Sequence, residues 1–533
     1  MQLSFLLPIL GFIAFALYKV LNAIVTRYQD ARRSRQLGCE PLPSFPDDGF
    51  LGIKLLKRMI TADKEFLFPN FLLDRSKQMA EMHGRPVGSY QQATLGQTIV
   101  MTSDPKNIQA LLSTQFDDFG LGEARRGNMM ATLGDGIFVQ DGKAWEHSRA
   151  LIRPSFVRDQ VSDLDLEERH VQNMMRAIPA QSDGWTADTN LQTLFFRLTL
   201  DSATEFLFGS SVDSQIVNAP GMETEKTKSV ITDENTFASA FDVAQKHLAR
   251  RFRFGDLYWL HNPKDFKEAN KNVNDFVDHF VHLALRSELK EKRLGESHKK
   301  EKYVFLDALA AQTKDPVELR AQILNILLAG RDTTASLLSW LFHLLVRHPL
   351  VLVRLRNTII QNFGTYRDPH EITFATLKGC QYLQWCINET LRLWPVVPSN
   401  ARRSLRATTL PRGGGPDGMS PIYVEKGKEV LYSVMVMQRR TDLWGPDADE
   451  FKPERWQGRK PGWDYLPFNG GPRICVGQQF ALTEAGYVTV RLLQRFEKIE
   501  AAGDELQGIV GSNLTLTNAP AKGPWVRMME AKQ

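Results

Sequence analysis

The sequence is poor in cysteine and carries no strong excess of charge of either sign. Only four of its 533 residues are cysteines, namely Cys39, Cys380, Cys386 and Cys475. So few cysteines exclude a small disulfide-stapled secreted domain and indicate a reducing compartment. The spacing of Cys380 and Cys386 does not fit a zinc knuckle. Lys and Arg number 66 against 61 Asp and Glu. This small excess of positive charge is too mild to indicate a nucleic-acid-binding protein.

Nucleotide-binding fingerprints are also missing. Neither G-x-x-x-x-G-K-[ST] nor G-x-G-x-x-G occurs, so we expect neither bound NADPH nor bound flavin in this chain. Internal repeats and low-complexity segments are absent as well. What the chain does have is 43% hydrophobic and 10% aromatic residues, enough to bury a large core and to exclude wholesale disorder.

A long apolar run lies at the N-terminus. Residues 3–25 can cross a bilayer, and their one charge, Lys19, is near enough to the end to reach the headgroups. Four arginines follow between residues 27 and 35, which places the rest of the chain in the cytosol. The alternative, a cleaved signal peptide, would need basic residues before the run and a small-residue cleavage site after it. We therefore predict a transmembrane anchor over 1–26, a basic and proline-rich hinge over 27–50, and a large catalytic domain over 51–533.

The rest of the chain is interpreted as mainly helical with a small β lobe. Strand-like patterns run from about Val87 to Met101 and from Ala401 to Val436, where Gly413 to Gly415 mark a turn. Two polar stretches, 210–234 and 288–302, are expected to be mobile. The stretch Ala321–Leu345 is apolar on nearly every side, which indicates either a buried helix or a second membrane span. Because Arg331 and Asp332 lie at its centre, a buried helix is favoured.

The strongest motif surrounds the last cysteine. Residues 468–477 read Phe-Asn-Gly-Gly-Pro-Arg-Ile-Cys-Val-Gly, an instance of F-x-x-G-x-R-x-C-x-G. A glycine-rich turn can present the Cys475 sulfur to a flat metal cofactor while its backbone N–H groups stabilise the thiolate. The pattern suits a thiolate-ligated haem, with Arg473 paired to an acidic edge of the cofactor. An inert buried cysteine is the plain alternative, and a Cys–His nucleophile would need a histidine supplied by the fold.

With this motif the chain resembles the cytochrome P-450 family, and the resemblance covers nearly the whole sequence. It implies the P-450 fold, a haem b cofactor and Cys475 as the axial ligand of its iron. Phe468 matches the aromatic residue packed beside the thiolate, and Arg473 matches a partner of a haem propionate.

Other propionate partners are implied by the same resemblance. Trp145 and Arg149 share one helix face, at the spacing that the family uses against a propionate. Arg402 matches a further propionate-binding position, with Arg403 as its rival. Without the cysteine motif, Trp145 would be interpreted as a core residue and Arg149 as a solvated one.

The centre of the apolar helix also matches the family. Residues 329–334, Ala-Gly-Arg-Asp-Thr-Thr, are similar to A-G-x-D-T. Oxygen activation consumes protons, and a carboxylate and a hydroxyl can deliver them, so Asp332 and Thr333 are the predicted catalytic residues. Gly330 is expected to leave room for oxygen. The structural alternative is a Thr333 hydroxyl bonded to a carbonyl one turn earlier, and both interpretations can hold together.

A third group is assigned to stability. Glu389 and Arg392 match the family's E-x-x-R, which places both side chains on one helix face. Arg455, in the downstream segment FKPERW, matches the residue that completes this ion-pair network. The group precedes the cysteine motif in the order that the family shows.

Within the family the chain is most similar to the fungal branch that oxidises n-alkanes and fatty acids. The segments that carry this similarity are FFRLTLDSATEFLFG, LLAGRDTTA, YSVMVMQRRTDLWGPDADEFKPERW and PFNGGPRICVGQQFALTEA. Gln438 departs from the histidine expected there, and we expect the change to be of minor consequence. Ala329 stands where some animal fatty-acid hydroxylases carry a glutamate esterified to the haem, so no covalent link is predicted.

The resemblance also outlines a substrate pocket. It implies contributions from the loop Phe119–Leu133, from the residues after Pro395 and from a turn near Leu514. The pocket residues it suggests are Leu133, Ala329, Val396, Val397 and Leu514. Their apolar character suits a long hydrocarbon chain, and it equally suits a terpenoid or a polyketide of a fungal secondary-metabolite pathway.

The expected enzyme is therefore a monooxygenase of the endoplasmic reticulum membrane with a cytosolic catalytic domain. Its electrons should come from an NADPH–cytochrome P-450 reductase, with cytochrome b5 as a second candidate donor. Two other classes of haem-thiolate protein fit the sequence less well. Relatives that rearrange peroxides often lack the acid–alcohol pair that Asp332 and Thr333 provide, and a haem-thiolate sensor would need no proton relay.

Overall fold

The computed structural model describes residues 3–46, 48–94, 96–156, 164–217, 225–294, 303–507 and 509–532. Contacts divide the chain into two compact units, which are described separately. Unit 1 comprises residues 1–56, 76–120 and 401–433, and unit 2 comprises residues 57–75, 121–400 and 434–533. The expected mainly helical architecture with a small β lobe is confirmed.

Unit 1 is built on a five-stranded sheet of order β1-β2-β8-β5-β3. The hairpin of β1 and β2 is antiparallel, and β2 then pairs in parallel with β8. A separate hairpin joins β6 and β7, and Gly415 (φ 79°) lies at the predicted glycine turn. The strands are β1 (Ser89–Thr94), β2 (Gln97–Thr102), β3 (Phe119–Gly120), β5 (Ser399–Ser404), β6 (Thr408–Gly414), β7 (Ser420–Val424) and β8 (Glu429–Ser433).

The helices of unit 1 begin with α1 (Leu3–Gln36), whose stretch Leu10–Gln36 is long and apolar enough to cross a membrane. Its described large apolar side chains, such as Phe12 and Leu21, are exposed. At the end of α1, the Tyr423 hydroxyl donates to Asp30 at 2.8 Å. The shorter helices are η1 (Phe50–Gly52), α4 (Pro105–Gln109), η2 (Ala110–Thr114) and η3 (Phe116–Asp118), while α2 (Ile53–Lys64) and α3 (Phe68–His83) cross the unit boundaries.

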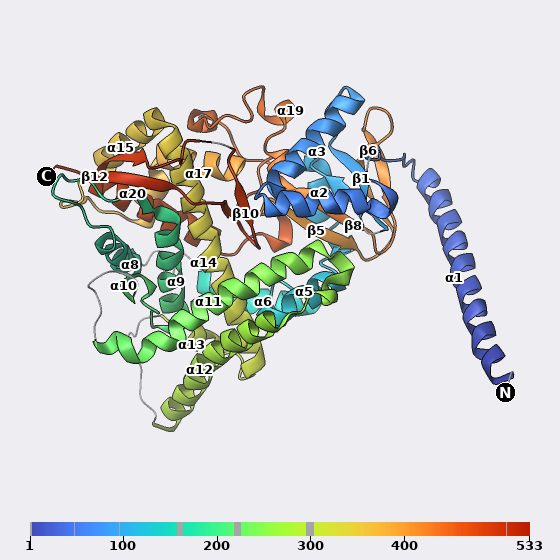
Figure 1. The fold of residues 1–533 in the computed structure, drawn as a ribbon, viewed down its shortest axis with the longest axis horizontal. Helices are drawn as coiled ribbons and strands as arrows, with labels where there is room; N and C mark the ends of the chain where they lie inside the picture. Colours follow the sequence, from blue (N-terminus) through green and yellow to red (C-terminus); the bar gives the residue numbers. More distant parts are fainter. Residues whose placement is uncertain are drawn as a thin grey trace. The chain divides into compact units, whose positions relative to one another are not determined.

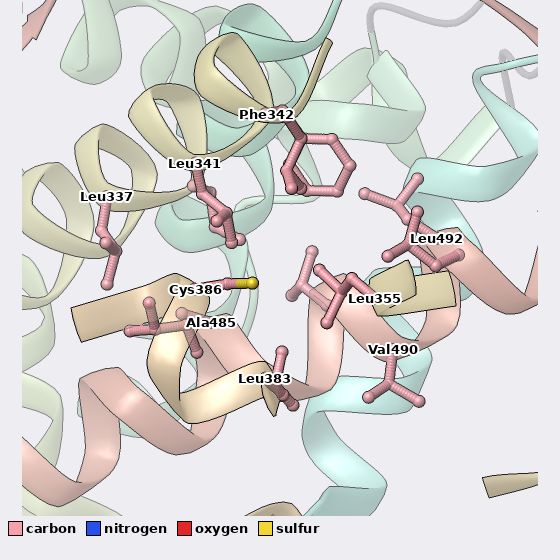
Figure 2. Close-up of a cluster of buried hydrophobic side chains, with 14 of the residues drawn as sticks. Leu337, Leu341, Phe342, Leu355, Leu383, Cys386, Ala485, Val490 and Leu492 are labelled. Carbon is pink, nitrogen blue, oxygen red and sulfur yellow. The ribbon is translucent and has the colours of Figure 1, made fainter. Parts of the chain in front are cut away.

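Unit 2 is organised around α14 (Pro316–Arg347), most of whose residues are buried. This confirms the predicted buried helix and rules against the alternative of a second membrane span. Asp315 caps its N-terminus by accepting from the Val317 N–H at 2.9 Å. Helix α9 (Leu191–Phe208) runs along it (Figure 1). Figure 2 shows Leu337, Leu341 and Phe342 of α14 directed into a core shared with α15 (Pro349–Phe363), α17 (Gln381–Leu393) and α20 (Gln478–Arg495).

The other helices of unit 2 surround this core. They are α5 (Glu123–Leu133), α6 (Gly142–Ile152), η4 (Arg153–Phe156), α8 (Leu164–Arg176), α10 (Ser214–Val217), α11 (Glu225–Arg253), η5 (Gly255–Leu260), α12 (Lys264–Leu294), α13 (Phe305–Ala310), α16 (Phe374–Gly379), α18 (Val434–Met437), α19 (Thr441–Trp444), η6 (Pro453–Trp456) and η7 (Gly471–Arg473). The strands are β4 (Thr189–Asn190), β9 (Phe496–Ala501), β10 (Ser512–Leu514), β11 (Asn518–Pro520) and β12 (Trp525–Glu530). They form two small sheets, β4-β12-β9 and β10-β11.

The two stretches expected to be polar and mobile coincide with long helices over much of their length. Residues 225–234 belong to α11 and residues 288–294 to α12. Residues 218–224 and 295–302 lie outside the described residues. Lys, Glu, Arg and Leu are good helix formers, so a polar composition by itself does not oppose a helix.

Candidate active site

The cysteine motif folds into a tight loop between η6 and α20. The Cys475 N–H donates to the Phe468 carbonyl at 3.0 Å, so the two ends of the loop lie opposite each other. Gly471 adopts a left-handed conformation at φ 68°, which favours glycine. A Cβ at Gly470 would lie 2.9 Å from the Trp463 ring, so this position also requires glycine. The glycines of the motif therefore shape the turn that presents Cys475.

The Cys475 side chain is accessible, although protein surrounds it. Desolvation by that surrounding protein raises the pKa of the thiol, whereas the Gly477 N–H and the charge of Arg149 act in the opposite direction. Its accessibility leaves the sulfur open to a bound group. Among the described residues, no group of three or more His, Cys, Asp or Glu could hold a metal ion.

Two arginines and a tryptophan lie beside this loop, and their role towards a propionate stays a prediction. The Arg473 guanidinium lies 4.4 Å from the Trp145 ring centroid and that of Arg149 lies 5.9 Å from it. Arg149 also donates to the Ile474 carbonyl at 3.0 Å, which ties α6 to the cysteine loop. The structure thus brings Trp145, Arg149 and Arg473 together around the residue preceding Cys475.

Arg402 belongs to unit 1, where it lies on β5. Its side chain is buried, its guanidinium lies 5.6 Å from the Tyr432 ring centroid, and it donates to the Ala401 carbonyl at 2.8 Å. The rival Arg403 pairs with Glu429 at 3.2 Å. Burial of a charged group favours Arg402 over Arg403 as a functional arginine, and its role towards a propionate stays a prediction.

Helix α14 has one accessible face. Every residue from Ala321 to Val346 is buried except Ala329, Gly330 and Thr333, which are half-exposed. Positions three and four apart share a side of a helix, so Ala329 and Gly330 both lie on the side of Thr333 and the three residues form one accessible face. A Cβ on Gly330 would lie 3.7 Å from that of Ala203 on α9, an ordinary van der Waals contact, so packing against α9 does not require glycine here. That Gly330 leaves room for oxygen stays a prediction.

The acid and the alcohol of the predicted relay face different neighbours. The Thr333 hydroxyl donates to the Ala329 carbonyl at 2.5 Å, one helical turn earlier. This is the bond expected if Thr333 has a structural role. Asp332 is buried beside Arg331, whose Nη1 lies 3.4 Å from its Oδ1 and 2.6 Å from Asp242 on α11. Burial raises the pKa of Asp332 to about 6, Arg331 lowers it, and the charge of Asp242 raises it. Asp242 is a participant that sequence patterns did not indicate.

The E-x-x-R residues form a fully buried network, as expected. Arg392 donates to both carboxylate oxygens of Glu389 at 2.8 Å, and Arg455 Nε lies 3.3 Å from Glu389 Oε1. Arg392 also donates to the carbonyls of Gln438 and Ala448. Several backbone partners are thus held by one bidentate pair.

Gln438, the departure from the expected histidine, lies at a buried position; that the departure is of minor consequence stays a prediction. Its side chain is fully buried, donates to the Leu391 and Arg392 carbonyls at 3.0 Å each, and accepts from the Leu466 N–H at 2.8 Å. Gln438 therefore links the E-x-x-R network to the start of the cysteine loop. The sequence showed only a departure from the expected histidine, because the partners lie 28 and 47 residues away.

The predicted pocket residues fall into two groups. The Asn518 N–H donates to the Val396 carbonyl at 2.9 Å, and Asn518 pairs with Leu514 between β10 and β11, which brings Val396 and Leu514 together. The Leu133 carbonyl accepts from Asn325 of α14 at 3.0 Å, one helical turn before Ala329. Val397 is exposed and Leu133 fully buried. Whether these residues line a substrate site stays a prediction.

Comparisons with known proteins place these features in context. A family model described as Cytochrome P450 matches residues 67–522. Cytochrome P450 monooxygenase g430 of Fusarium sp is 52% identical over 96% of this chain and 88% of the relative. Cytochrome P450 52A4 of Candida maltosa is 51% identical over 77% of this chain and 75% of the relative. The crystal structure of the cytochrome P450DA heme domain has a TM-score of 0.72 at 21% identity, covering 93% of this chain and 98% of that one, which shows the fold.

Proposed function

The chain belongs to the cytochrome P450 family and is a P450 monooxygenase, and we propose that it hydroxylates the terminal carbon of n-alkanes or fatty acids. The proposal includes a haem b bound through Cys475, electrons from an NADPH–cytochrome P-450 reductase, and cytochrome b5 as a second donor. It also places the enzyme in the endoplasmic reticulum membrane, anchored by α1, with a cytosolic catalytic domain over 51–533. The apolar and exposed side chains of α1 support the anchor.

The residues present fit a haem. Cys475 would bind the iron, Phe468 would lie beside the thiolate, and Arg473, Arg149 and Trp145 would hold the acidic edge. A thiolate-ligated haem, when bound, supplies the activation of molecular oxygen. The protein supports this by donating the Gly477 N–H to the sulfur and by placing the positive charge of Arg149 close to it.

Proton delivery is assigned to Asp332 and Thr333. A monooxygenase reaction takes up two electrons and two protons, inserts one oxygen atom into a C–H bond and releases the other as water. The Thr333 hydroxyl lies on the accessible face of α14, where it would pass on a proton when it turns away from its bond to the Ala329 carbonyl. Asp332 precedes it in the sequence, with a pKa of about 6 that suits proton exchange near neutral pH.

The observation that carries the oxygen chemistry is the accessible face of α14, formed by Ala329, Gly330 and Thr333 in an otherwise buried helix. The lipid substrate is supported by the four segments shared with the fungal n-alkane and fatty-acid branch and by the apolar residues predicted to line the pocket, namely Leu133, Ala329, Val396, Val397 and Leu514. A dry apolar channel would favour a hydrocarbon chain by burial of its methylene groups.

The test is reconstitution of the full chain in membranes with a fungal reductase and NADPH. Products from dodecane and lauric acid would be identified by mass spectrometry. A terminal alcohol or dicarboxylic acid is the expected result. Cys475→Ala should remove both the product and the reduced carbon-monoxide Soret band of thiolate haem, whereas Cys39→Ala should keep both. A wild-type sample that shows thiolate haem and forms no product would overturn the substrate proposal.

The second candidate is a monooxygenase that tailors a terpenoid or a polyketide. What supports it is the apolar character of the predicted pocket residues, which suits a terpenoid or a polyketide as well as a hydrocarbon chain. The same reconstituted sample distinguishes the two, because a pathway enzyme would leave dodecane and lauric acid unchanged while its haem spectrum remained normal.

A further inference from the structure

Asp141 occupies the first position before α6, yet its side chain makes no capping bond to that helix. An aspartate at this position ordinarily accepts from the backbone N–H groups of its own first turn. Here the carboxylate is directed elsewhere, which leaves the start of α6 without this cap. A residue that gives up a favourable local bond is held by stronger partners.

Those partners come from two distant segments. The Leu121 N–H donates to both carboxylate oxygens of Asp141, at 3.0 and 2.8 Å, and the Gly122 N–H lies 3.4 Å from one of them. Arg473 Nη2 donates to Asp141 Oδ1 at 2.7 Å and to the Gln140 carbonyl at 3.0 Å. The carboxylate therefore joins the residues that lead into α5 to the arginine two positions before Cys475.

The other end of α5 is also tied down. Asn325 of α14 donates to the Leu133 carbonyl at 3.0 Å and accepts from the Phe138 N–H at 3.1 Å. Helix α5 is thus fixed to α14 at its C-terminus and to the cysteine loop at its N-terminus. Only the N-terminal attachment passes through a charged side chain, and hydrogen bonds to ionised groups are about twice as strong as neutral ones.

We propose that Asp141 is a positioning residue that couples the N-terminus of α5 to Arg473. Arg473 contacts both Gln140 and Asp141 through the same nitrogen, Nη2. These two residues therefore set the direction of the Arg473 guanidinium, and with it the contact that Arg473 makes with an acidic cofactor edge. A displacement of α5 by substrate would then change the contact between Arg473 and the cofactor. By reciprocity, binding of the cofactor to Arg473 would make the N-terminus of α5 more rigid. The inference rests on the proposed function for its cofactor and substrate.

The first experiment requires neither the cofactor nor the substrate. Hydrogen exchange of a peptide covering residues 119–125 would be measured in the full chain without haem. Asp141→Asn should make the Leu121 and Gly122 amides exchange on the order of tenfold faster, since a charged acceptor is lost. The matched control is Asp135→Asn in the same loop, where Asp135 pairs with Arg126 at 2.8 Å. This control should leave the peptide unchanged.

The second experiment tests the coupling in both directions. Asp141→Asn should release haem several-fold faster than wild type, Asp141→Glu should recover most of the retention, and Arg473→Ala should lower protection of the 119–125 peptide. Unchanged haem release in Asp141→Asn, or unchanged protection in Arg473→Ala, would overturn the coupling. If Asp141→Asn does not fold, the Arg473→Ala exchange measurement decides alone. Absence of lauric acid hydroxylation would count against the proposed substrate and would leave these readouts intact.

Discussion

Arg331 and Asp242 form an ion pair in which Arg331 Nη1 lies 2.6 Å from Asp242 Oδ1. The Asp242 charge offsets part of the effect that Arg331 has on the neighbouring Asp332. Arg331 lies between the two carboxylates, lowering the pKa of Asp332 while Asp242 raises it. Asp242 is exposed, whereas Arg331 and Asp332 are buried. The carboxylate that precedes Thr333 in the sequence is thus adjusted by a residue on another helix.

Replacing Asp242 by asparagine should shift the titration of Asp332. Removal of its charge leaves Arg331 to act on Asp332 alone, so the pKa of Asp332 should fall below its value of about 6. In the proposed reaction Asp332 must be protonated to donate, so the alkaline limb of the pH–rate profile should move to lower pH. Asp278→Asn is a control, because Asp278 pairs with Arg320 on the same helix as Arg331. An alkaline limb that does not move would show that Asp332 does not set it.

Thr333→Ala should separate NADPH consumption from product formation. Loss of the hydroxyl removes the proton donor on the accessible face of α14, and the product formed per NADPH should fall at least about tenfold, with peroxide released instead. Thr390→Ala is the matched control, since Thr390 makes the same one-turn bond, to the Cys386 carbonyl at 2.8 Å, on α17. Unchanged coupling in Thr333→Ala would show that its bond to Ala329 is the whole of its role.

A buried carboxyl pair should make stability depend on pH. Glu167 on α8 and Glu484 on α20 are both buried, and each also lies beside a polar group, Ser202 and Thr334 respectively. Burial raises the pKa of Glu167 from an ordinary 4.5 to about 7, and burial together with the charge of Glu167 raises that of Glu484.

Because the folded state then binds more protons than the unfolded state between about pH 4.5 and 7, the free energy of unfolding should fall as pH rises through this window. Glu167→Gln should flatten the fall by up to about 3 kcal/mol. The measurement is denaturant unfolding of the full chain in detergent at several pH values. The exposed Glu146→Gln serves as control, and an identical slope in Glu167→Gln and wild type would contradict the assignment.

Gln438→Leu should destabilise the protein by about 2–4 kcal/mol, because it leaves the buried Leu466 N–H and two carbonyls without their partner. Gln384→Leu is a control on α17, where a half-buried glutamine makes one bond to the Leu377 carbonyl. Its cost should stay within about 0.5 kcal/mol. Denaturant midpoints measure both, and equal midpoints would show that Gln438 is replaceable.

Local patterns were sufficient for the elements and for the residues that act within a short segment. The apolar run predicted α14, the strand-like patterns predicted β1, β2 and β5 to β8 but not β3 or the strands of unit 2, and the spacing of Glu389 and Arg392 placed both on one helix face. The glycines around Cys475 were predicted for the same reason, since a turn depends on residues adjacent in the chain.

Relationships between distant segments were beyond these patterns. Asp242 is 89 residues from Arg331, Asp141 is 332 residues from Arg473, and no periodicity links either pair. The sequence by itself determined which chemistry the chain carries, because the side-chain types present fix which groups can bind a metal or exchange a proton. Only the tertiary structure decided their charge states and orientation, because these depend on desolvation and on neighbours that folding brings within a few ångströms.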